Sequence, residues 1–155
     1  MRTLKISFFI FTLQISLFAQ NHWFYQNPLP QGNTLHSVQL VSDDVGWAVG
    51  DCGTIIKTTD GGITWKSQSI REPYDLYSAD FINLNKGFIV GGEINLFYDS
   101  GTFLKTTDGG SNWFFQIIST KGLYGISFFD DNNGIAVGKE GTILKTTNSG
   151  QNWIS

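Results

Sequence analysis

Cysteine, proline and arginine are scarce in this sequence of 155 residues. Its one cysteine, Cys52, cannot close a disulfide within the chain, so the fold has to be stabilised by packing. Cys52 is interpreted as a tolerated turn residue. The reason is that the sequence around it is repeated later in the chain, where Glu140 stands in the matching position. A reactive thiol or a bridge between chains is the alternative. Proline occurs 3 times but glycine 18 times, and no long stretch shows helical periodicity. Short apolar runs between Gly and Asp turns predict an all-β protein.

Basic residues are too few and too scattered for a nucleic-acid site. After position 19, Arg71 is the only arginine, and 8 Lys+Arg stand against 13 Asp+Glu, a net charge of −5. Binding to phosphates needs clustered Lys and Arg, so nucleic acid is not expected as a partner. No metal site is expected, because His22 and His36 stand apart from the cysteine and no ligand spacing recurs. No motif indicates a cofactor.

A long apolar run occurs only at the N-terminus. Arg2 and Lys5 precede the apolar residues 6–18, and Ala19 offers a small residue at a cleavage point. This layout is typical of a secretory signal peptide over residues 1–19, and the run is shorter than the about 20 residues of a membrane span. An uncleaved anchor or an apolar first strand is the alternative. We expect an exported protein, periplasmic, at the cell surface or secreted, with no transmembrane span after cleavage.

Internal repetition is the strongest feature of the remaining residues. GWAVG at 46–50 returns as GFIVG at 87–91 and GIAVG at 134–138. GTIIKTTDGG at 53–62 is matched by GTFLKTTDGG at 101–110 and GTILKTTNSG at 141–150. Each copy ends in a tryptophan, and Trp23 resembles the end of a preceding copy, so that the spacings along the chain are 42, 48 and 40 residues. A period near 40 with four strands per unit is typical of a propeller blade.

The repeats predict three four-stranded antiparallel blades within residues 20–155, over about 35–70, 76–118 and 123–155, with a preceding strand near 23–28. The first strand of each alternates between apolar and polar residues, and the second is apolar throughout, as in a strand covered on both faces. Closed propellers use 4 to 8 blades. The prediction is therefore a partial β-propeller, an incomplete ring. Further blades are expected from the same longer chain or, alternatively, from an oligomer.

The middle repeat carries an insertion of seven residues within 92–100. Gly91 and Gly101 are ten positions apart, whereas the matching glycines are three apart in the other repeats. Phe97 and Tyr98 within the insertion are predicted contacts for a protein or glycan partner, since exposed aromatic residues often anchor interfaces. A neutral lengthening of the loop is the alternative.

The segments 58–65, 106–113 and 146–153 fit the Asp-box pattern, Ser/Thr-x-Asp-x-Gly-x-Ser/Thr-Trp. The second has Asn112 in the Ser/Thr place, and the third fits more loosely, with Asn148 in place of Asp. An Asp or Asn side chain can accept backbone N–H bonds from the loop, glycine takes up conformations that other residues resist, and the tryptophan can fold over the turn. The predicted structural turn residues are Asp60, Gly62, Trp65, Asp108, Gly110, Trp113, Asn148, Gly150 and Trp153.

Catalytic acids or calcium ligands are the alternative reading of Asp60 and Asp108. Repetition argues against it, because an enzyme needs a catalytic acid once whereas every blade needs a turn. Asn148 also keeps the hydrogen bonds but could not perform acid–base chemistry. No catalytic residue and no metal ligand is predicted.

These motifs resemble those of the Asp-box (BNR) β-propellers, most closely the photosystem II stability and assembly factor-like propellers, over residues 23–155. The resemblance implies a propeller fold and a non-catalytic role in protein binding or assembly. It also implies a basic, arginine-rich binding surface, toward which this sequence offers only Arg71 after the leader.

The alternative is that this chain is part of an Asp-box glycoside hydrolase, such as a xyloglucan-degrading enzyme. Sialidases of this type bind the sugar carboxylate with three arginines, which Arg71 alone cannot supply. A pair of carboxylates for another glycosidase is left open by the acidic residues present. The candidate residues are Asp43, Asp44, Asp80, Asp130 and Asp131. The pairs Asp43-Asp44 and Asp130-Asp131 occupy equivalent turns of their repeats, which favours their interpretation as solvated turn residues.

Overall fold

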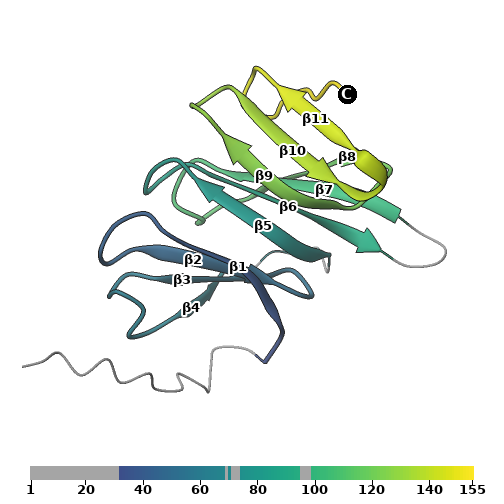
Figure 1. Cartoon of the computed structure of the whole chain (residues 1–155). Coiled ribbons are helices and arrows are strands. Elements are labelled where there is room, and N and C mark those ends of the chain that lie inside the picture. The colour runs from purple at the N-terminus through teal and green to yellow at the C-terminus, as the bar shows by residue number, and fades with distance from the viewer. Residues whose placement is uncertain (1–31, 69, 71–73, 95–98) are drawn as a thin grey trace, which may run out of the picture.

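The computed structural model describes residues 32–68, 70, 74–94 and 99–155. The signal peptide, the strand expected near 23–28 and the contact residues Phe97 and Tyr98 lie outside them. Three antiparallel sheets follow one another along this part of the chain (Figure 1). Within it, no helix is long and apolar enough to span a membrane.

Each sheet is one repeat, with neighbouring strands paired in chain order. The first blade comprises β1 (Leu35–Leu40), β2 (Gly46–Gly50), β3 (Thr54–Thr58) and β4 (Lys66–Gln68). The second comprises β5 (Asp75–Phe81), β6 (Gly87–Ile94), β7 (Asp99–Thr106) and β8 (Phe114–Ser119). The third comprises β9 (Leu123–Phe128), β10 (Gly134–Gly138) and β11 (Ile143–Thr146), with a short 3₁₀ turn at Lys139–Gly141. The predicted class, an all-β partial propeller, is confirmed.

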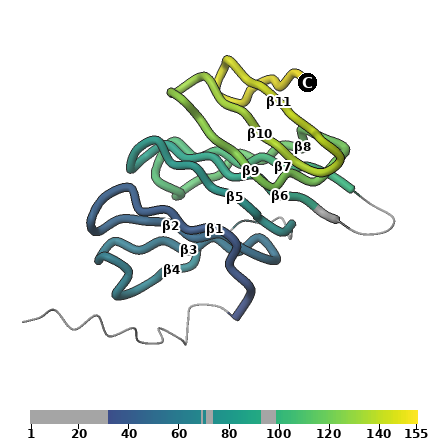
Figure 2. Tube along the Cα trace, in the orientation of Figure 1, coloured from purple at the N-terminus to yellow at the C-terminus, as the bar shows by residue number. Residues whose placement is uncertain are grey.

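The third blade differs from the prediction in its last strand. Instead of a fourth strand, a single isolated bridge joins Lys145 of β11 to Ile154. The sheet is therefore three-stranded, although Trp153 occupies the place where the fourth strand of the other blades begins. The tube in Figure 2 shows this third sheet at the end of the series.

The same strand register recurs in all three blades. Trp47 pairs with Lys57 in the first blade, and the equivalent pairs are Phe88 with Lys105 and Ile135 with Lys145. The insertion leaves this register intact, because Gly91 pairs with Thr102 as Gly50 pairs with Thr54. Residues can therefore be compared blade by blade.

The core lies between blades rather than within one sheet. One buried cluster joins blades 1 and 2, and a second joins blades 2 and 3. Aromatic rings stack across both interfaces: Trp47 on Phe81 at 3.9 Å and Phe88 on Phe128 at 3.6 Å between ring centroids. Such pairs combine a large buried area with a preferred ring geometry. Stacking of one repeat on the next thus holds the fold together.

The second strand is covered on both faces in two blades only. Every residue of β2 is buried, and so are Phe88, Ile89 and Val90 of β6. In β10, however, Ala136 is buried while Ile135 and Val137 are exposed. The expected cover on both faces fails here because no described blade packs on the far side of the third sheet.

The insertion lengthens a hairpin. Three further pairs extend β6 and β7 beyond the common register, up to Ile94 opposite Asp99. The shorter turns of the other blades contain Cys52 and Glu140, both at positive φ, 53° and 56°. The free thiol of Cys52 is exposed in this turn.

Candidate functional site

The Asp-box turn joins the third strand of a blade to the tryptophan. In the first blade the buried Thr58 hydroxyl donates to Asp60 Oδ1 at 2.9 Å and accepts the Gly62 N–H at 2.8 Å. The Asp60 carboxylate also accepts the N–H of Thr64 at 2.8 Å and its hydroxyl at 2.6 Å. One carboxylate thus binds residues on both sides of the loop, which closes the turn.

The other two turns repeat this pattern with different side chains. Asp108 accepts the Asn112 N–H at 2.9 Å and its side-chain amide at 2.7 Å. In the third blade, the Asn148 amide oxygen accepts the Asn152 N–H at 2.9 Å and the Thr146 hydroxyl at 3.0 Å. The neutral amide oxygen therefore makes the bonds that Oδ1 of the carboxylate makes in the other two blades.

Hydrogen bonding stabilises the charged form of both aspartates. The Thr64 hydroxyl beside Asp60 lowers the pKa of that carboxyl below its usual 3.8. The side-chain amide of Asn112 lowers the pKa of Asp108 in the same way. A general acid needs the opposite shift, toward the working pH.

Each Asp box also contacts the first turn of its own blade. The Gly61 N–H donates to Asp44 O, and the equivalent bonds run from Gly109 to Asn85 and from Ser149 to Asn132. Ser149 lies at φ 60°, where the other two blades have glycine. The two turns at this end of every blade are therefore held together by a backbone bond.

The half-buried tryptophans lie close to their turns and to the blade interfaces. A Cβ on Gly62 would meet the Trp65 ring at 3.8 Å. Trp113 packs edge-on against Phe81, and Trp153 against Phe103 of the preceding blade at 5.3 Å. Trp113 and Trp153 thus join the clusters that bind one blade to the next.

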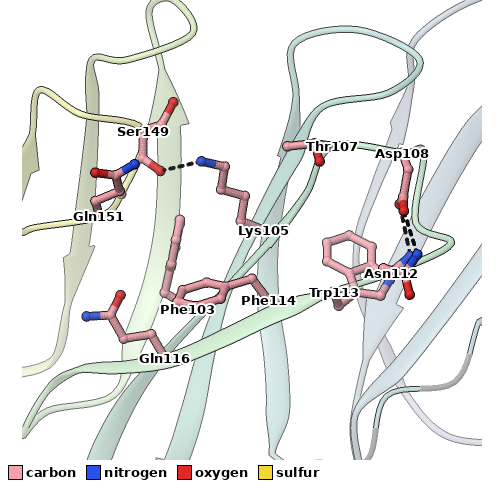
Figure 3. A pocket seen from close by; sticks show the side chains of 11 residues that line it. Phe103, Lys105, Thr107, Asp108, Asn112, Trp113, Phe114, Gln116, Ser149 and Gln151 are labelled. Atoms are coloured by element: carbon pink, nitrogen blue, oxygen red, sulfur yellow. Dashed lines mark hydrogen bonds between the residues drawn. The ribbon is translucent and has the colours of Figure 1, made fainter.

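A groove of about 640 Å³ opens between blades 2 and 3 (Figure 3). Figure 3 shows Phe103, Phe114 and Gln116 on one side of it and the Asp-box residues Ser149 and Gln151 on the other. The Phe114 side chain is 59% exposed, so its ring is available to a ligand. The remaining lining residues are Lys105, Thr107, Asp108, Asn112, Trp113 and Gly150.

The equivalent space between blades 1 and 2 is occupied by a side chain. Gln68 donates its amide to Gly109 O at 3.3 Å, and a Cβ on Gly110 would meet Gln68 at 2.2 Å. Gln116 holds the position of Gln68, but the nearest neighbour of a Cβ on Gly150 would be the Phe103 ring at 2.3 Å. The groove at blade 3 is therefore formed where this glutamine is not packed over the Asp box.

A cationic group stands at the edge of the groove. Lys105 Nζ donates to Ser149 O at 3.3 Å, and burial lowers the pKa of its ammonium. The nearby Lys86 lowers that pKa further and donates to the Ser149 hydroxyl at 3.0 Å. An anionic ligand group here would compensate a partly desolvated positive charge.

Three of the other acidic candidates have structural partners. Asp80 accepts the Phe128 N–H across the blade interface, Asp130 accepts the N–H groups of Asn132 and Asn133, and Asp131 lies 3.7 Å from Lys86. No group of three or more His, Cys, Asp or Glu side chains suited to a metal ion occurs among the described residues.

The sequence prediction missed the groove residues Phe103, Lys105, Phe114 and Gln116. The lysine before each Thr-Thr-Asp/Asn motif recurs at Lys57, Lys105 and Lys145, and that recurrence is the one signal that could have pointed to this edge.

The family model described as "Photosynthesis system II assembly factor YCF48" matches residues 16–121 and 71–155. The photosystem II stability/assembly factor HCF136 of Oryza sativa subsp. japonica is 39% identical over 54 residues, 34% of this chain and 13% of that protein. The photosystem II assembly lipoprotein Ycf48 of a Picosynechococcus species is 42% identical over 57 residues, 35% of this chain and 17% of that protein. The chain thus spans less than a fifth of these two relatives.

Solved structures show the same fold. The structure titled "YCF48 bound to D1 peptide" superposes with a TM-score of 0.70 and 29% identity, over 81% of this chain and 40% of that one. An ancestral GH74 enzyme superposes with a TM-score of 0.63 at 18% identity, over 77% of this chain and 18% of that one, a likeness of fold alone. Because the family model matches nearly all of the described residues, this chain belongs to the family of the photosynthesis system II assembly factor YCF48.

Proposed function

We propose that this chain is an exported, non-catalytic propeller module that binds a segment of another protein and supports its assembly into a complex. The observation that carries the proposal is the open groove between blades 2 and 3. Function in propellers resides in such surface sites rather than in the fold.

The groove offers a peptide two kinds of contact. The exposed ring of Phe114, with Phe103 behind it, provides an apolar anchor site, and aromatic residues often dominate peptide affinity. Lys105 and Gln116 provide polar groups beside these rings. A peptide that pairs an apolar side chain with a carboxylate fits this combination. The relative whose structure is titled as bound to a D1 peptide supports a peptide as the class of ligand.

The partner surface differs from the arginine-rich one that the resemblance implied. Lys105 and Lys86 are the cations at this end of the interface between blades 2 and 3. The partner is therefore proposed by chemistry, a protein segment with apolar and acidic residues. Phe97 and Tyr98 of the insertion remain a second proposed contact.

Hydrolysis of glycans is not supported by this groove. Asp108 is the only acidic residue that lines it, whereas retaining and inverting glycosidases both require two carboxyl groups. Its hydrogen bonds also lower its pKa, and a glycosidase general acid has a raised one.

Selection of a phage-displayed library of random peptides on the immobilised chain tests the proposal. Peptides that pair aromatic or aliphatic residues with Asp or Glu are expected to be enriched. Phe114→Ala should weaken the best of them about tenfold, or ~1.4 kcal/mol. Lys105→Gln should remove the preference for acidic residues. Leu84→Ala, at an exposed turn outside the groove, is the matched control.

Two outcomes would contradict the assignment. One is a library without enriched peptides. The other is a set of selected peptides that bind the Phe114→Ala variant as tightly as the unmodified chain.

A further inference from the structure

The far side of blade 3 exposes residues that are buried in the other two blades. Ile135, Val137 and Ile143 are 48%, 43% and 61% exposed. Their equivalents by strand register are fully buried at 0% exposure: Trp47, Val49 and Ile55 in blade 1, and Phe88, Val90 and Phe103 in blade 2. We call the surface of Ile135, Val137 and Ile143 the trailing face.

The first strand of blade 1 is uncovered in the same manner. Leu35, Val38 and Leu40 are 43%, 66% and 59% exposed. In the following blades, the residues in these positions contact the blade before them and are largely buried: Leu76, Ala79 and Phe81, and Leu123, Ile126 and Phe128. We call the surface of Leu35, Val38 and Leu40 the leading face.

The two interfaces inside the chain show what covers a trailing face. In both, the trailing side of one blade packs on the leading side of the next. The stacked pairs are Trp47 with Phe81 and Phe88 with Phe128. By strand register, Ile135 on the trailing face corresponds to Trp47 and Phe88. Leu40 on the leading face corresponds to Phe81 and Phe128. The uncovered faces are therefore complementary to each other in residue position and in apolar character.

A hydrogen bond also crosses each interface, from a backbone N–H on the leading side of one blade to a polar side chain of the blade before it. Gln39 Oε1 accepts the Phe81 N–H at 2.7 Å, and Asp80 accepts the Phe128 N–H in the next interface. Ser127 holds this position in blade 3 and has a hydroxyl that can accept the Leu40 N–H.

A repeated lysine makes a second polar contact across each interface. Lys57 donates to Gly109 O at 3.0 Å and Lys105 to Ser149 O at 3.3 Å, both in the Asp box of the next blade. Lys145 is the third copy and is exposed. The matching acceptor at the other end of the chain is the carbonyl of Gly61 in the first Asp box.

We propose that two copies of this chain associate head to tail, with the trailing face of each copy on the leading face of the other. The occupant is a second copy because the leading face of blade 1 supplies the apolar strand, the Leu40 N–H and the Gly61 carbonyl that this interface uses. Two copies contribute six blades, within the range of about 4 to 8 found in closed propellers. Surfaces of this head-to-tail kind produce a closed ring when the rotation closes.

Light scattering after gel filtration measures the association. The purified chain is expected to have twice the mass of one copy. Val137→Glu on the trailing face and Leu40→Glu on the leading face should each give single copies, because each variant places a charge in both interfaces of the ring. Leu84→Glu is the matched control, since it adds the same charge at a turn where the other blades have Asp43 and Asp131. It should keep the twofold mass.

Mixing distinguishes head-to-tail association from pairing of like faces. A mixture of Val137→Glu and Leu40→Glu chains retains one unmodified interface, so paired chains should reappear. If like faces paired, only one of the two variants would disrupt association and mixing would restore nothing. Neither residue lines the peptide groove, so both variants should bind the selected peptides as before.

Cysteine crosslinking keeps the test independent of the glutamate variants, which could lose their fold. In a Cys52→Ser background, chains with Ile135→Cys mixed with chains with Leu40→Cys should form a crosslinked pair on oxidation. Neither variant should do so alone. A chain that stays single in solution, or that crosslinks equally well through Ile135→Cys alone, would overturn the proposal.

Discussion

Asparagine at position 148 shows which property of the Asp box the turn uses. Its amide oxygen accepts the threonine hydroxyl and the backbone N–H that Oδ1 of Asp60 and of Asp108 accepts in the other boxes. What the three residues share is an acceptor on a short side chain, which is the requirement of an Asx-type turn. The carboxylates of the first two blades add a negative charge and a second acceptor oxygen, which binds the side chain of Thr64 or Asn112.

The presence of carboxylates at Asp60 and Asp108, and of an amide at Asn148, predicts a pH dependence of the free energy of unfolding. The pKa values of Asp60 and Asp108 are lowered in the folded state, so their contribution is present above the usual 3.8 and is lost as the pH falls through the folded values. In the double variant Asp60→Asn/Asp108→Asn, the free energy of unfolding should therefore fall less steeply on acidification. Asn148→Asp should steepen the fall. Urea denaturation at a series of pH values from about 5 to about 2 measures these slopes. Parallel curves for all three proteins would contradict the prediction.

The threonine that begins each box carries a second residue-scale prediction. Thr106 is 1% exposed, and its hydroxyl accepts the Gly110 N–H at 2.9 Å. Valine has the same shape but cannot accept this bond, and a buried donor without a partner costs about 1–3 kcal/mol. Thr106→Val should lower the free energy of unfolding by that amount in urea denaturation. The neighbouring exposed Thr107 supplies the control, because Thr107→Val should change stability by less than about 0.5 kcal/mol.

At the scale of strands, the repeat made most of the architecture predictable. Equivalent motifs such as GWAVG and GFIVG adopt the same strand register, so β2 and β6 could both be predicted once one blade was recognised. The groove could not be predicted, because it depends on whether Gln68 or Gln116 packs over the following Asp box. That choice involves residues about 40 positions apart, Gln68 with Gly109 for example. Periodicity along the chain contains no information on it.

The long β6–β7 hairpin provides the element-scale prediction. Replacing residues 92–101 by Lys-Glu-Gly, the turn of blade 3 at 139–141, should leave the pairing of Gly91 with Thr102 in place, as Gly50 pairs with Thr54. The bonds that the Gly122 N–H and Lys139 Nζ donate to Asp99 are lost, so the free energy of unfolding should fall slightly. Far-ultraviolet circular dichroism should keep the shape of a β-sheet spectrum, with the loss of only the three strand pairs of the insertion. The shortened chain should bind selected peptides more weakly if Phe97 and Tyr98 contact them, and equally well if the insertion is a neutral loop. Loss of cooperative unfolding would show that the hairpin is needed for the fold.

For the whole molecule, stability is distributed over blade interfaces, as in other repeat proteins. The cluster between blades 1 and 2 shares no residue with the one between blades 2 and 3. Blade 2 takes part in both clusters, through Leu76 and Phe81 on one side and Phe88 and Phe103 on the other. Damage to one interface should therefore act first on the outer blade beside it.

Phe128→Ala tests this arrangement. The Phe128 ring stacks on Phe88 at 3.6 Å and meets the Trp153 ring at 6.2 Å, so its removal leaves a cavity between blades 2 and 3. Truncation of a buried phenylalanine costs about 3–5 kcal/mol. Hydrogen exchange followed by mass spectrometry should show faster exchange in β9, β10 and β11, while β2 and β3 stay protected. Equal loss of protection in all three blades would instead indicate that the array unfolds as one cooperative unit, and that blade 1 depends on an interface it does not touch.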